Sequence, residues 1–324
     1  MGGEGEQPAA STEPEGRLAR AEEFVQLRPL LFAIAYRILG SVAEAEDVVQ
    51  ETWLRYDEAG VRPESPKAYL STVVTRLAVN VLKSARVRRE AYVGEWFPEP
   101  LLEDPYRDPE RAAELADSVS MAALVLLERL SPLERAAFVL RDVFGFEYAE
   151  IAAAVDRSQD ACRQLVARSR RHVRAGRPRF IADRDAQEEL AARFFAAIAE
   201  GDVAQLRDLL AADVQLITDT GGNAPAPPRP IVGAEKTVRV LARIAPELAR
   251  LGLRLQPRTI NAAPGAIAED RDGRVLQAIT LEIGDGQIQT IRAVANPDKL
   301  AHVGPIADGW AVSEEFRHGR RPQR

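Results

Sequence analysis

The sequence predicts a multidomain protein in which two all-α domains are followed by an α+β domain. Apolar residues recur at helical spacing from about residue 21 to residue 173. Strand-like runs gather only after residue 213, where Asp272–Gly273 and Asp285–Gly286 suit the turns of antiparallel hairpins. A chain of 324 residues is long enough for three domains that each bury a core.

Charge is distributed unevenly along this chain. The formal net charge is −6, which taken alone argues against a nucleic-acid-binding protein. Between Arg157 and Arg184, however, nine arginines stand against only Asp160 and Asp183. A basic block joined to acidic segments is typical of a DNA-binding module connected to other domains. A GC-rich coding genome is an alternative source for part of the arginine excess.

The composition excludes several classes of protein. Cys162 is the single cysteine, so an internal disulfide and a cysteine-based metal cage are excluded. No run reaches the ~18 continuous apolar residues of a membrane span, and the N-terminus lacks the basic-then-apolar pattern of a signal peptide. We therefore expect a cytoplasmic protein with no metal site and no membrane contact.

The first domain is expected to be a compact helical one. Residues 1–20 are rich in Gly, Glu, Pro and Ala and are expected to form a disordered tail. Ser41 is expected to cap the second of the helices that follow, and Ser65 with Pro66 to begin the third. The domain is expected to span residues 21–91, with helices over residues 21–39, 41–56 and 66–89.

An acidic, proline-rich segment follows at residues 92–117 and is expected to be an extended linker. Aromatic residues are unusual in a solvated linker. Trp96 and Phe97 are therefore expected to dock on another part of the molecule.

The second helical domain, residues 118–179, contains a basic helical pair. A helix is expected over residues 117–130, and Ser131, Pro132 and Glu134 then form a capping box. Helices are expected over residues 148–155 and 159–173, with a tight turn between them. Arginines lie off the apolar stripe of the last helix, as in a helix-turn-helix that presents side chains to a DNA major groove. On this pattern alone, a helical hairpin with a solvated basic face carries equal weight, and Cys162 is expected to be a small buried residue.

The run Ala45–Arg55 (AEDVVQETWLR), continued in order by Ala68–Glu90, resembles region 2 of bacterial extracytoplasmic-function (ECF) sigma factors of the sigma-70 family. The resemblance implies that the first run docks on the β′ clamp of core RNA polymerase, whereas Trp53 is expected to pack in the core. The implied polymerase-binding residues are Asp47, Gln50, Glu51 and Arg55. The residues implied to bind the melted −10 promoter element are Asp57, Arg62, Lys67, Arg76, Asn80, Lys83 and Arg86.

The basic helical pair resembles region 4 of the same family, in which Ala161–Arg170 would be the recognition helix. This region also implies a contact with the β flap of the polymerase. The residues implied to contact the −35 element are Ser158, Gln159, Arg163, Gln164, Arg168, Arg170 and Arg171. Arginine suits this role because its guanidinium fork bonds guanine edges or phosphates in two places. Which arginines read bases and which hold phosphates stays open.

The last domain, residues 184–318, is expected to be an α+β cone. Helices are expected over residues 185–200, 203–212 and 234–251, and strands over residues 214–218, 253–260, 266–269, 275–283 and 287–295. This pattern resembles the NTF2-like, SnoaL-type fold, whose sheet wraps around a pocket able to hold a small ligand of unknown identity. The runs Tyr92–Pro100 and Asn296–Leu300 resemble motifs of the ECF subgroup that carries such a domain.

This resemblance implies a contact of the last domain with the linker and the sigma domains. The implied interdomain residues are Trp96, Phe97, Pro98, Asp219, Gly221 and Gly222. The subgroup often has a lysine after the glycines, whereas Asn223 follows them here. Asp219 and Glu282 are candidate pocket acids, but a rim or solvated position is expected for each, and no catalytic residue is expected.

The sequence thus predicts a sigma factor, not an enzyme. It would bind core RNA polymerase, recognise −35 and −10 elements and direct transcription initiation, with the C-terminal domain regulating this activity in cis. One alternative is a free-standing, ligand-sensing helix-turn-helix regulator. A weaker one is a SnoaL-type isomerase or hydrolase with a DNA-binding appendage. The polar helix at residues 47–55 favours the first, because an independent regulator has no need of it.

Overall fold

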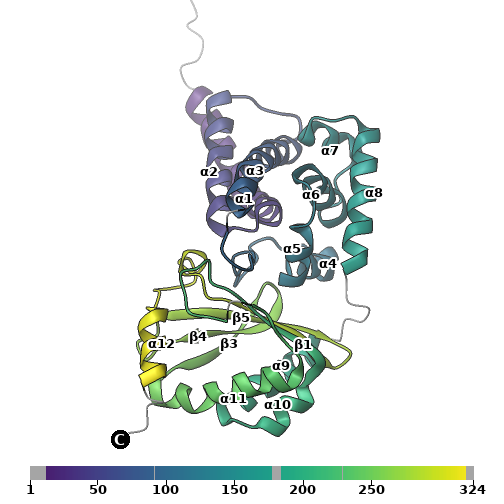
Figure 1. Ribbon diagram of the computed structural model, residues 1–324. Coiled ribbons are helices and arrows are strands. Elements are labelled where there is room, and N and C mark those ends of the chain that lie inside the picture. The colour runs from purple at the N-terminus through teal and green to yellow at the C-terminus, as the bar shows by residue number, and fades with distance from the viewer. Residues whose placement is uncertain (1–11, 91, 177–183, 228, 319–324) are drawn as a thin grey trace, which may run out of the picture.

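A single sheet separates two layers of helices in this protein (Figure 1). The computed structural model describes residues 12–90, 92–176, 184–227 and 229–318. Three helices of the C-terminal half cover one face of the sheet, and the helical N-terminal half lies over the other. Within the described ranges, no helix is long and apolar enough to cross a membrane.

The chain begins with three packed helices, α1 (Thr12–Leu39), α2 (Val42–Ala59) and α3 (Pro66–Glu90). The expectation of a disordered tail is wrong for residues 12–20, which form the first turns of α1, while residues 1–11 lie outside the described residues. Glu, Arg, Leu and Ala in this stretch favour a helix, and Arg17 is tied to Asp57 of α2 by an ion pair of 2.8 Å. Ser41 caps α2 as expected, because its side chain accepts the N–H of Glu44.

The second helical part differs from the prediction at its start. The linker ends earlier than expected, in η1 (Pro109–Arg111) and α4 (Ala112–Val119), and α5 (Met121–Leu127) is a separate helix. The predicted helix over residues 117–130 is wrong because Ser120 has a non-helical ψ of 145° and instead caps α5 with its side chain. The helices that follow are α6 (Pro132–Phe138), the π-helical turn η2 (Val139–Val143), α7 (Tyr148–Val155) and α8 (Gln159–Gly176). The capping box of Ser131 and Glu134 is confirmed.

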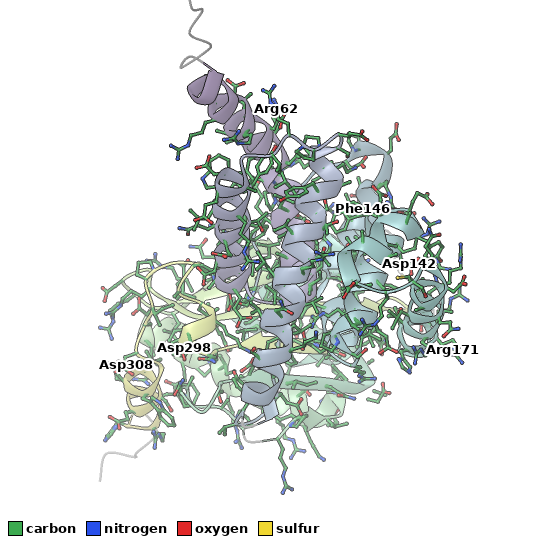
Figure 2. The ribbon with its side chains drawn as sticks, turned by 90° about the horizontal axis from the view of Figure 1, so that it is seen from above. Arg62, Asp142, Phe146, Arg171, Asp298 and Asp308 are labelled. Carbon is green, nitrogen blue, oxygen red and sulfur yellow. The ribbon has the colours of Figure 1, made fainter. Side chains whose placement is uncertain are left out.

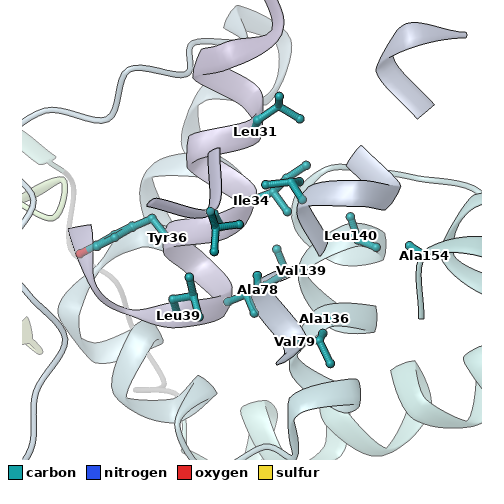
Figure 3. Close-up of a cluster of buried hydrophobic side chains, with 14 of the residues drawn as sticks. Leu31, Ile34, Tyr36, Leu39, Ala78, Val79, Ala136, Val139, Leu140 and Ala154 are labelled. Carbon is teal, nitrogen blue, oxygen red and sulfur yellow. The ribbon is translucent and has the colours of Figure 1, made fainter. Parts of the chain in front are cut away.

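The two helical parts share one hydrophobic core. Figure 3 shows Leu31 and Ile34 of α1 and Val79 of α3 gathered with Val139 and Leu140 of η2. Apolar side chains from α5, α6, α7 and α8 belong to the same cluster, and Cys162 is buried in it as expected. Because apolar burial is the main favourable term in association, the two parts are held against each other over an extended surface.

Two buried arginines tie this core together. Arg37 of α1 is fully buried and donates to Asp104 of the linker at 2.7 Å and to the hydroxyl of Ser118 on α4 at 2.9 Å. Arg135 of α6 is also buried and donates from Nε to the carbonyl oxygen of Arg37 at 3.1 Å. Buried charge is stable only when it is paired and hydrogen-bonded, so these contacts fix the registry of α1 against the linker, α4 and α6.

The C-terminal half is a mixed sheet with helices on one face. Its helices are α9 (Arg184–Glu200), α10 (Val203–Leu209), α11 (Ala234–Leu251), η3 (Pro297–Lys299) and α12 (Gly309–His318). Its strands are β1 (Leu210–Asp219), β2 (Ile231–Val232), β3 (Arg254–Ile260), β4 (Ala263–Glu269), β5 (Val275–Gly284) and β6 (Gln287–Val294). Their order is β2-β1-β6-β5-β4-β3, with only the β1–β6 pair parallel. Irregular registers in three of these pairings introduce the local bends that curve such a sheet.

The α+β fold class is confirmed, with local differences. The predicted helix over residues 203–212 is wrong at its end, because the chain leaves the helix at Leu210 and enters β1. The short elements β2, η3 and α12 were not predicted.

One apolar cluster fills the space between the helices of this half and the sheet. Phe194 and Phe195 of α9 and Leu241 of α11 belong to it on the helix side. Ile279 and Leu281 of β5 belong to it on the sheet side. Side chains two residues apart on a strand point to the same face, so the alternation along β5 supplies one wall of this core.

The opposite face of the sheet carries a second apolar cluster, and the N-terminal half contributes to it. Phe97 of the linker and Met121 of α5 pack there with Ile260, Ile267 and Val294 of the strands. The sheet therefore has a core on each face, and side chains of the N-terminal half complete the second one.

Candidate nucleic-acid interface and interdomain contacts

The helix-turn-helix presents its polar side chains to solvent. Ser158 caps α8 by accepting the N–H of Ala161 at 3.2 Å, which fixes the start of the expected recognition helix. Leu165, Val166 and Ser169 are buried on its inner face. The structure leaves all the residues expected at the −35 element exposed, namely Ser158, Gln159, Arg163, Gln164, Arg168, Arg170 and Arg171.

Several of these arginines already have local partners. Arg163 pairs with Asp160 at 2.6 Å, and its guanidinium lies 5.2 Å from the ring centroid of Tyr148. Arg170 donates to Asp142 at 3.0 Å, and this hydrogen bond raises its pKa. Arg171 lies at the outer edge of the helical half in Figure 2. The exposed pairs cost little to break, so they do not prevent these arginines from turning to DNA.

The residues expected to bind polymerase lie on the outer side of α2. Asp47, Gln50 and Arg55 are exposed, and Glu51 is half-buried. Arg55 donates to Glu51 at 2.7 Å, one helical turn earlier. Gln50 also lines a groove of about 370 Å³ between α1 and α2. Trp53 is half-buried there and packs against the core, as expected.

The residues expected at the −10 element are divided between solvent and the helix-turn-helix. Asp57 is held by Arg17, and Arg62 is exposed at the edge of the molecule (Figure 2). Lys67 lies 5.6 Å from the ring centroid of Phe146, which precedes α7. Arg76 donates to the carbonyl oxygen of Ala153 on α7 at 2.6 Å.

Two further residues of this set, Asn80 and Lys83, line a cavity of about 410 Å³ together with the end of α7. The side chain of Arg86, the last of the set, lies outside the described residues. Four residues expected at the −10 element therefore face the helix-turn-helix and not solvent alone: Lys67, Arg76, Asn80 and Lys83.

A buried carboxylate joins the C-terminal half to the linker. Asp219, at the end of β1, is fully buried, so the expectation of a rim or solvated position is wrong. It accepts the backbone N–H of Phe97 at 2.8 Å and a hydrogen bond from Nζ of Lys299 at 2.7 Å. The hydroxyl of Tyr92 donates to its other oxygen. These donors offset the desolvation of the carboxylate.

Lys299 completes this linker clasp, by which we mean Tyr92, Trp96, Phe97, Asp219 and Lys299. Its ammonium group donates to the carbonyl oxygen of Phe97 at 2.6 Å and lies 4.1 Å from the ring centroid of Trp96. Burial and the hydrogen bond to Asp219 raise the pKa of Tyr92, so its hydroxyl stays a donor. Lys299 thus contacts both the linker and the end of β1.

The glycines expected at this contact leave room for the linker. A Cβ atom on Gly221 would lie 2.9 Å from the hydroxyl of Tyr92 and closer still to the side chain of Asn296. A Cβ atom on Gly222 would touch Val93 at 3.6 Å. Both glycines have positive φ, which side chains disfavour. The structure therefore brings both of them against the linker, where Pro98 is also buried.

The linker continues from the clasp to the start of α2. Glu99 accepts the hydroxyl of Ser41 and the backbone N–H of Val42, each at 2.7 Å. A carboxylate at the first turn of a helix satisfies unpaired amides and complements the helix dipole. His302 of the C-terminal half contacts the carbonyl oxygen of Pro100 at 2.6 Å. The linker is therefore bonded on one side to α2 and on the other to the sheet domain.

The tip of the β3–β4 hairpin makes a second interdomain contact that the sequence did not indicate. Asn261 has a left-handed φ of 53° and is 1% exposed. Its side-chain amide donates to the hydroxyl of Tyr36 on α1 at 2.7 Å and to the carbonyl oxygen of Val119 on α4 at 3.1 Å. Its side-chain oxygen accepts the N–H of Leu101 in the linker at 3.1 Å. One side chain thus joins both helical parts and the linker to the sheet domain.

Sequence reasoning missed several of these interdomain residues. Asparagine is among the few residues that tolerate a left-handed backbone, and this is the one local signal that marks Asn261. The roles of Tyr36, Glu99 and Lys299 depend on partners far away along the chain, which the sequence does not reveal.

The remaining candidate acid, Glu282, is mostly covered rather than solvated. Its side chain is 19% exposed and pairs with Arg292 of β6 at 2.7 Å. The guanidinium of Arg292 on the neighbouring strand therefore compensates the charge of this carboxylate.

Comparisons with known proteins bear on both halves of the chain. Models of Sigma-70 region 2 and of Sigma-70, region 4 match residues 24–88 and 120–173. The chain is 39% identical over 290 residues to the ECF RNA polymerase sigma factor SigJ of Mycobacterium tuberculosis, a match that covers 86% of this chain and 92% of that protein. It is 30% identical over 308 residues to SigG of the same organism, covering 86% and 78%. The crystal structure of SigJ matches with a TM-score of 0.69 and 35% identity, over 89% of this chain and 100% of that one.

Proposed function

Because the chain belongs to the ECF RNA polymerase sigma factors, we propose that its C-terminal half regulates transcription initiation in cis. It does so by holding α3 against the helix-turn-helix. We call this state, which is the one in the structure, the closed arrangement. The observation that carries this proposal is the contact between α3 and the helix-turn-helix, in which Lys67 and Arg76 are engaged. The exposed guanidinium of Arg76 keeps further donors, but a DNA strand that follows α3 would need the space beside it that α7 occupies. Promoter recognition therefore requires α3 and α7 to separate.

The contacts of the C-terminal half support this regulatory role. Asn261 bonds to α1, α4 and the linker together, so separation of the helical parts must break at least part of this set. The clasp around Asp219 holds the linker in the same way. Both contacts stabilise the closed arrangement, and any partner that weakens them favours the open one.

We propose the following assignment of surfaces. The exposed face of α2, with Asp47, Gln50 and Arg55, docks on the β′ clamp of core RNA polymerase, and the helix-turn-helix part contacts the β flap. The −10 element is bound by α3 and the loop before it, and the −35 element by α8. The docking face on α2 is exposed in the closed arrangement, whereas four exposed side chains of the −10 surface, Lys67, Arg76, Asn80 and Lys83, lie beside the helix-turn-helix. We propose that the protein carries out this activity in the bacterial cytoplasm.

Regulation is favoured over catalysis by the interior of the C-terminal half. The space between its helices and sheet is occupied by apolar side chains, among them Phe194, Phe195, Leu206 and Ile288, all less than 9% exposed. Asp219 is committed to structural hydrogen bonds, and Glu282 is paired. Neither acid is poised to exchange a proton with a substrate.

Run-off transcription with purified core polymerase tests the proposed function. The full chain and a chain that ends after Arg179 would be compared on a panel of candidate promoters. We expect promoter-dependent transcripts, and more of them from the shorter chain. A free-standing regulator would bind DNA in this assay but add no transcript. Equal activity and equal polymerase affinity of the two chains would contradict regulation in cis and leave the sigma activity itself intact.

The recognition helix leads to a prediction about −35 binding. Arg163→Ala and Arg168→Ala should each weaken binding to a −35 duplex by about 1–3 kcal/mol if the arginine bonds DNA in two places. Arg239→Ala, an exposed arginine on α11, is the matched control and should have no effect. Fluorescence anisotropy with a labelled duplex measures the affinities. Unchanged affinity in both recognition-helix variants would show that other residues read this element.

A further inference from the structure

A positively charged groove runs between α3 and the helix-turn-helix. Its larger part is a cavity of about 410 Å³, and an adjoining cavity of about 350 Å³ shares Lys83 and Leu133 with it. The charged side chains that line the two cavities are Arg76, Lys83, Arg157 and Arg168, against Asp156 and Glu134. Positive groups therefore outnumber negative ones along an open groove that both promoter-reading parts line.

Carboxylates neutralise these cations only in part. Arg76 and Arg157 donate to the backbone carbonyl oxygens of Ala153 and Asp156, each at 2.6 Å. Arg168 lies 3.7 Å from Glu134, a loose ion pair. Among the residues that the structure describes, no carboxylate lies within 4.0 Å of the charged groups of Arg76, Lys83 or Arg157.

The positive charge comes from both sides of the groove. Arg76 and Lys83 belong to α3, whereas Arg157 and Arg168 belong to the helix-turn-helix. Closing the two parts therefore brings like charges together, which costs free energy. An anion bound between them would remove this cost, and a ligand that binds only the closed arrangement stabilises it by mass action.

The walls of the groove also have an apolar component. Val79 of α3, Leu133 of α6 and Val155 of α7 line the larger cavity, and Leu165 of α8 lines the adjoining one. The volume lies in the range of small-molecule sites, which combine apolar walls with a few charged groups. Such a lining suits an anion that carries phosphate groups on an apolar or planar body.

We propose that this groove binds a phosphorylated small molecule of the nucleotide class and that binding stabilises the closed arrangement. The phosphates lie against Lys83, Arg157 and Arg76, and the base lies against the apolar wall. Promoter DNA uses cations of the same surfaces after the parts have separated. Ligand and promoter therefore compete for these cations. The ligand concentration then controls the population of the closed arrangement independently of the contacts made by the C-terminal half.

Isothermal titration calorimetry on the full chain tests this site, with ATP and inorganic triphosphate as probes at constant ionic strength. We expect ATP to bind, and to bind more tightly than triphosphate because of the apolar wall. Lys83→Gln and Arg157→Gln should each weaken ATP binding by about tenfold or more, the loss expected for a charge-assisted hydrogen bond. Thermal unfolding without ligand checks that each variant folds.

Lys236→Gln is the matched control, because Lys236 is an exposed lysine on α11, outside the groove. It should leave ATP affinity unchanged. Absence of heat at millimolar ATP, or equal affinity in the Lys83→Gln and control variants, would overturn the site. Equal affinities for ATP and triphosphate would overturn the role of the apolar wall. None of these measurements requires polymerase or promoter DNA, so their outcome is independent of regulation in cis.

Discussion

Asp219→Asn is expected to open the closed arrangement and raise promoter-dependent transcription. The substitution keeps the shape of the side chain but removes the charge that compensates the buried ammonium group of Lys299. Removing one partner of a buried ion pair costs about 3–5 kcal/mol. Part of this free energy is lost from the contact between the sheet domain and the linker, because Asp219 also accepts the N–H of Phe97. Run-off transcription and urea unfolding measure the two consequences.

A control and a second variant separate the clasp from general destabilisation. Asp272→Asn makes the same chemical change at a side chain that is 62% exposed. It should change the free energy of unfolding by no more than about 0.5 kcal/mol and leave run-off transcription at the wild-type level. The double variant Asp219→Asn, Lys299→Met removes both charges, so it should be less destabilised than the sum of its single variants. Wild-type transcription and wild-type stability in Asp219→Asn would contradict the structural role of the clasp.

Local signals explain which elements could be predicted from the sequence. The boundaries of α7 and α11 were predicted correctly because apolar spacing and flanking turn residues mark both ends. The docking of Phe97 was predicted because an aromatic residue in an acidic linker needs a covered surface. The helix at residues 12–20 was missed because its composition resembles that of a disordered segment, and its ion pair with Asp57 was not visible.

The interdomain contacts depend on partners that are distant in sequence. The resemblance implied an interdomain contact for Asp219, but its burial was not expected because its partner Lys299 lies 80 residues away. Asn261 lies 225 residues from Tyr36, and nothing near either residue indicates the other. The surfaces proposed to bind DNA and polymerase could be inferred from local motifs, whereas the contact between α3 and the helix-turn-helix required the structure.

Asn261→Gly is expected to weaken the closed arrangement without straining the hairpin. Glycine adopts the left-handed backbone of residue 261 freely, and the bond from its own N–H to Leu101 can remain. The side-chain hydrogen bonds to Tyr36, Val119 and Leu101 are lost. Each buried group left without a partner costs about 1–3 kcal/mol. A total near 3 kcal/mol would raise the open population by about 100-fold.

Limited proteolysis of the linker measures this population, because cleavage of a transiently opened segment follows the fraction that is open. Cleavage between residues 92 and 108 should accelerate by up to about 100-fold in Asn261→Gly, as long as the open form stays the minor one. Asp285→Gly is the matched control, since Asp285 has a similar φ of 51° at an exposed hairpin tip. Its cleavage rate should stay at the wild-type value. Both substitutions place glycine at a left-handed position of a hairpin. Equal cleavage rates in the two variants would therefore mean that the side chain of Asn261 does not hold the halves together.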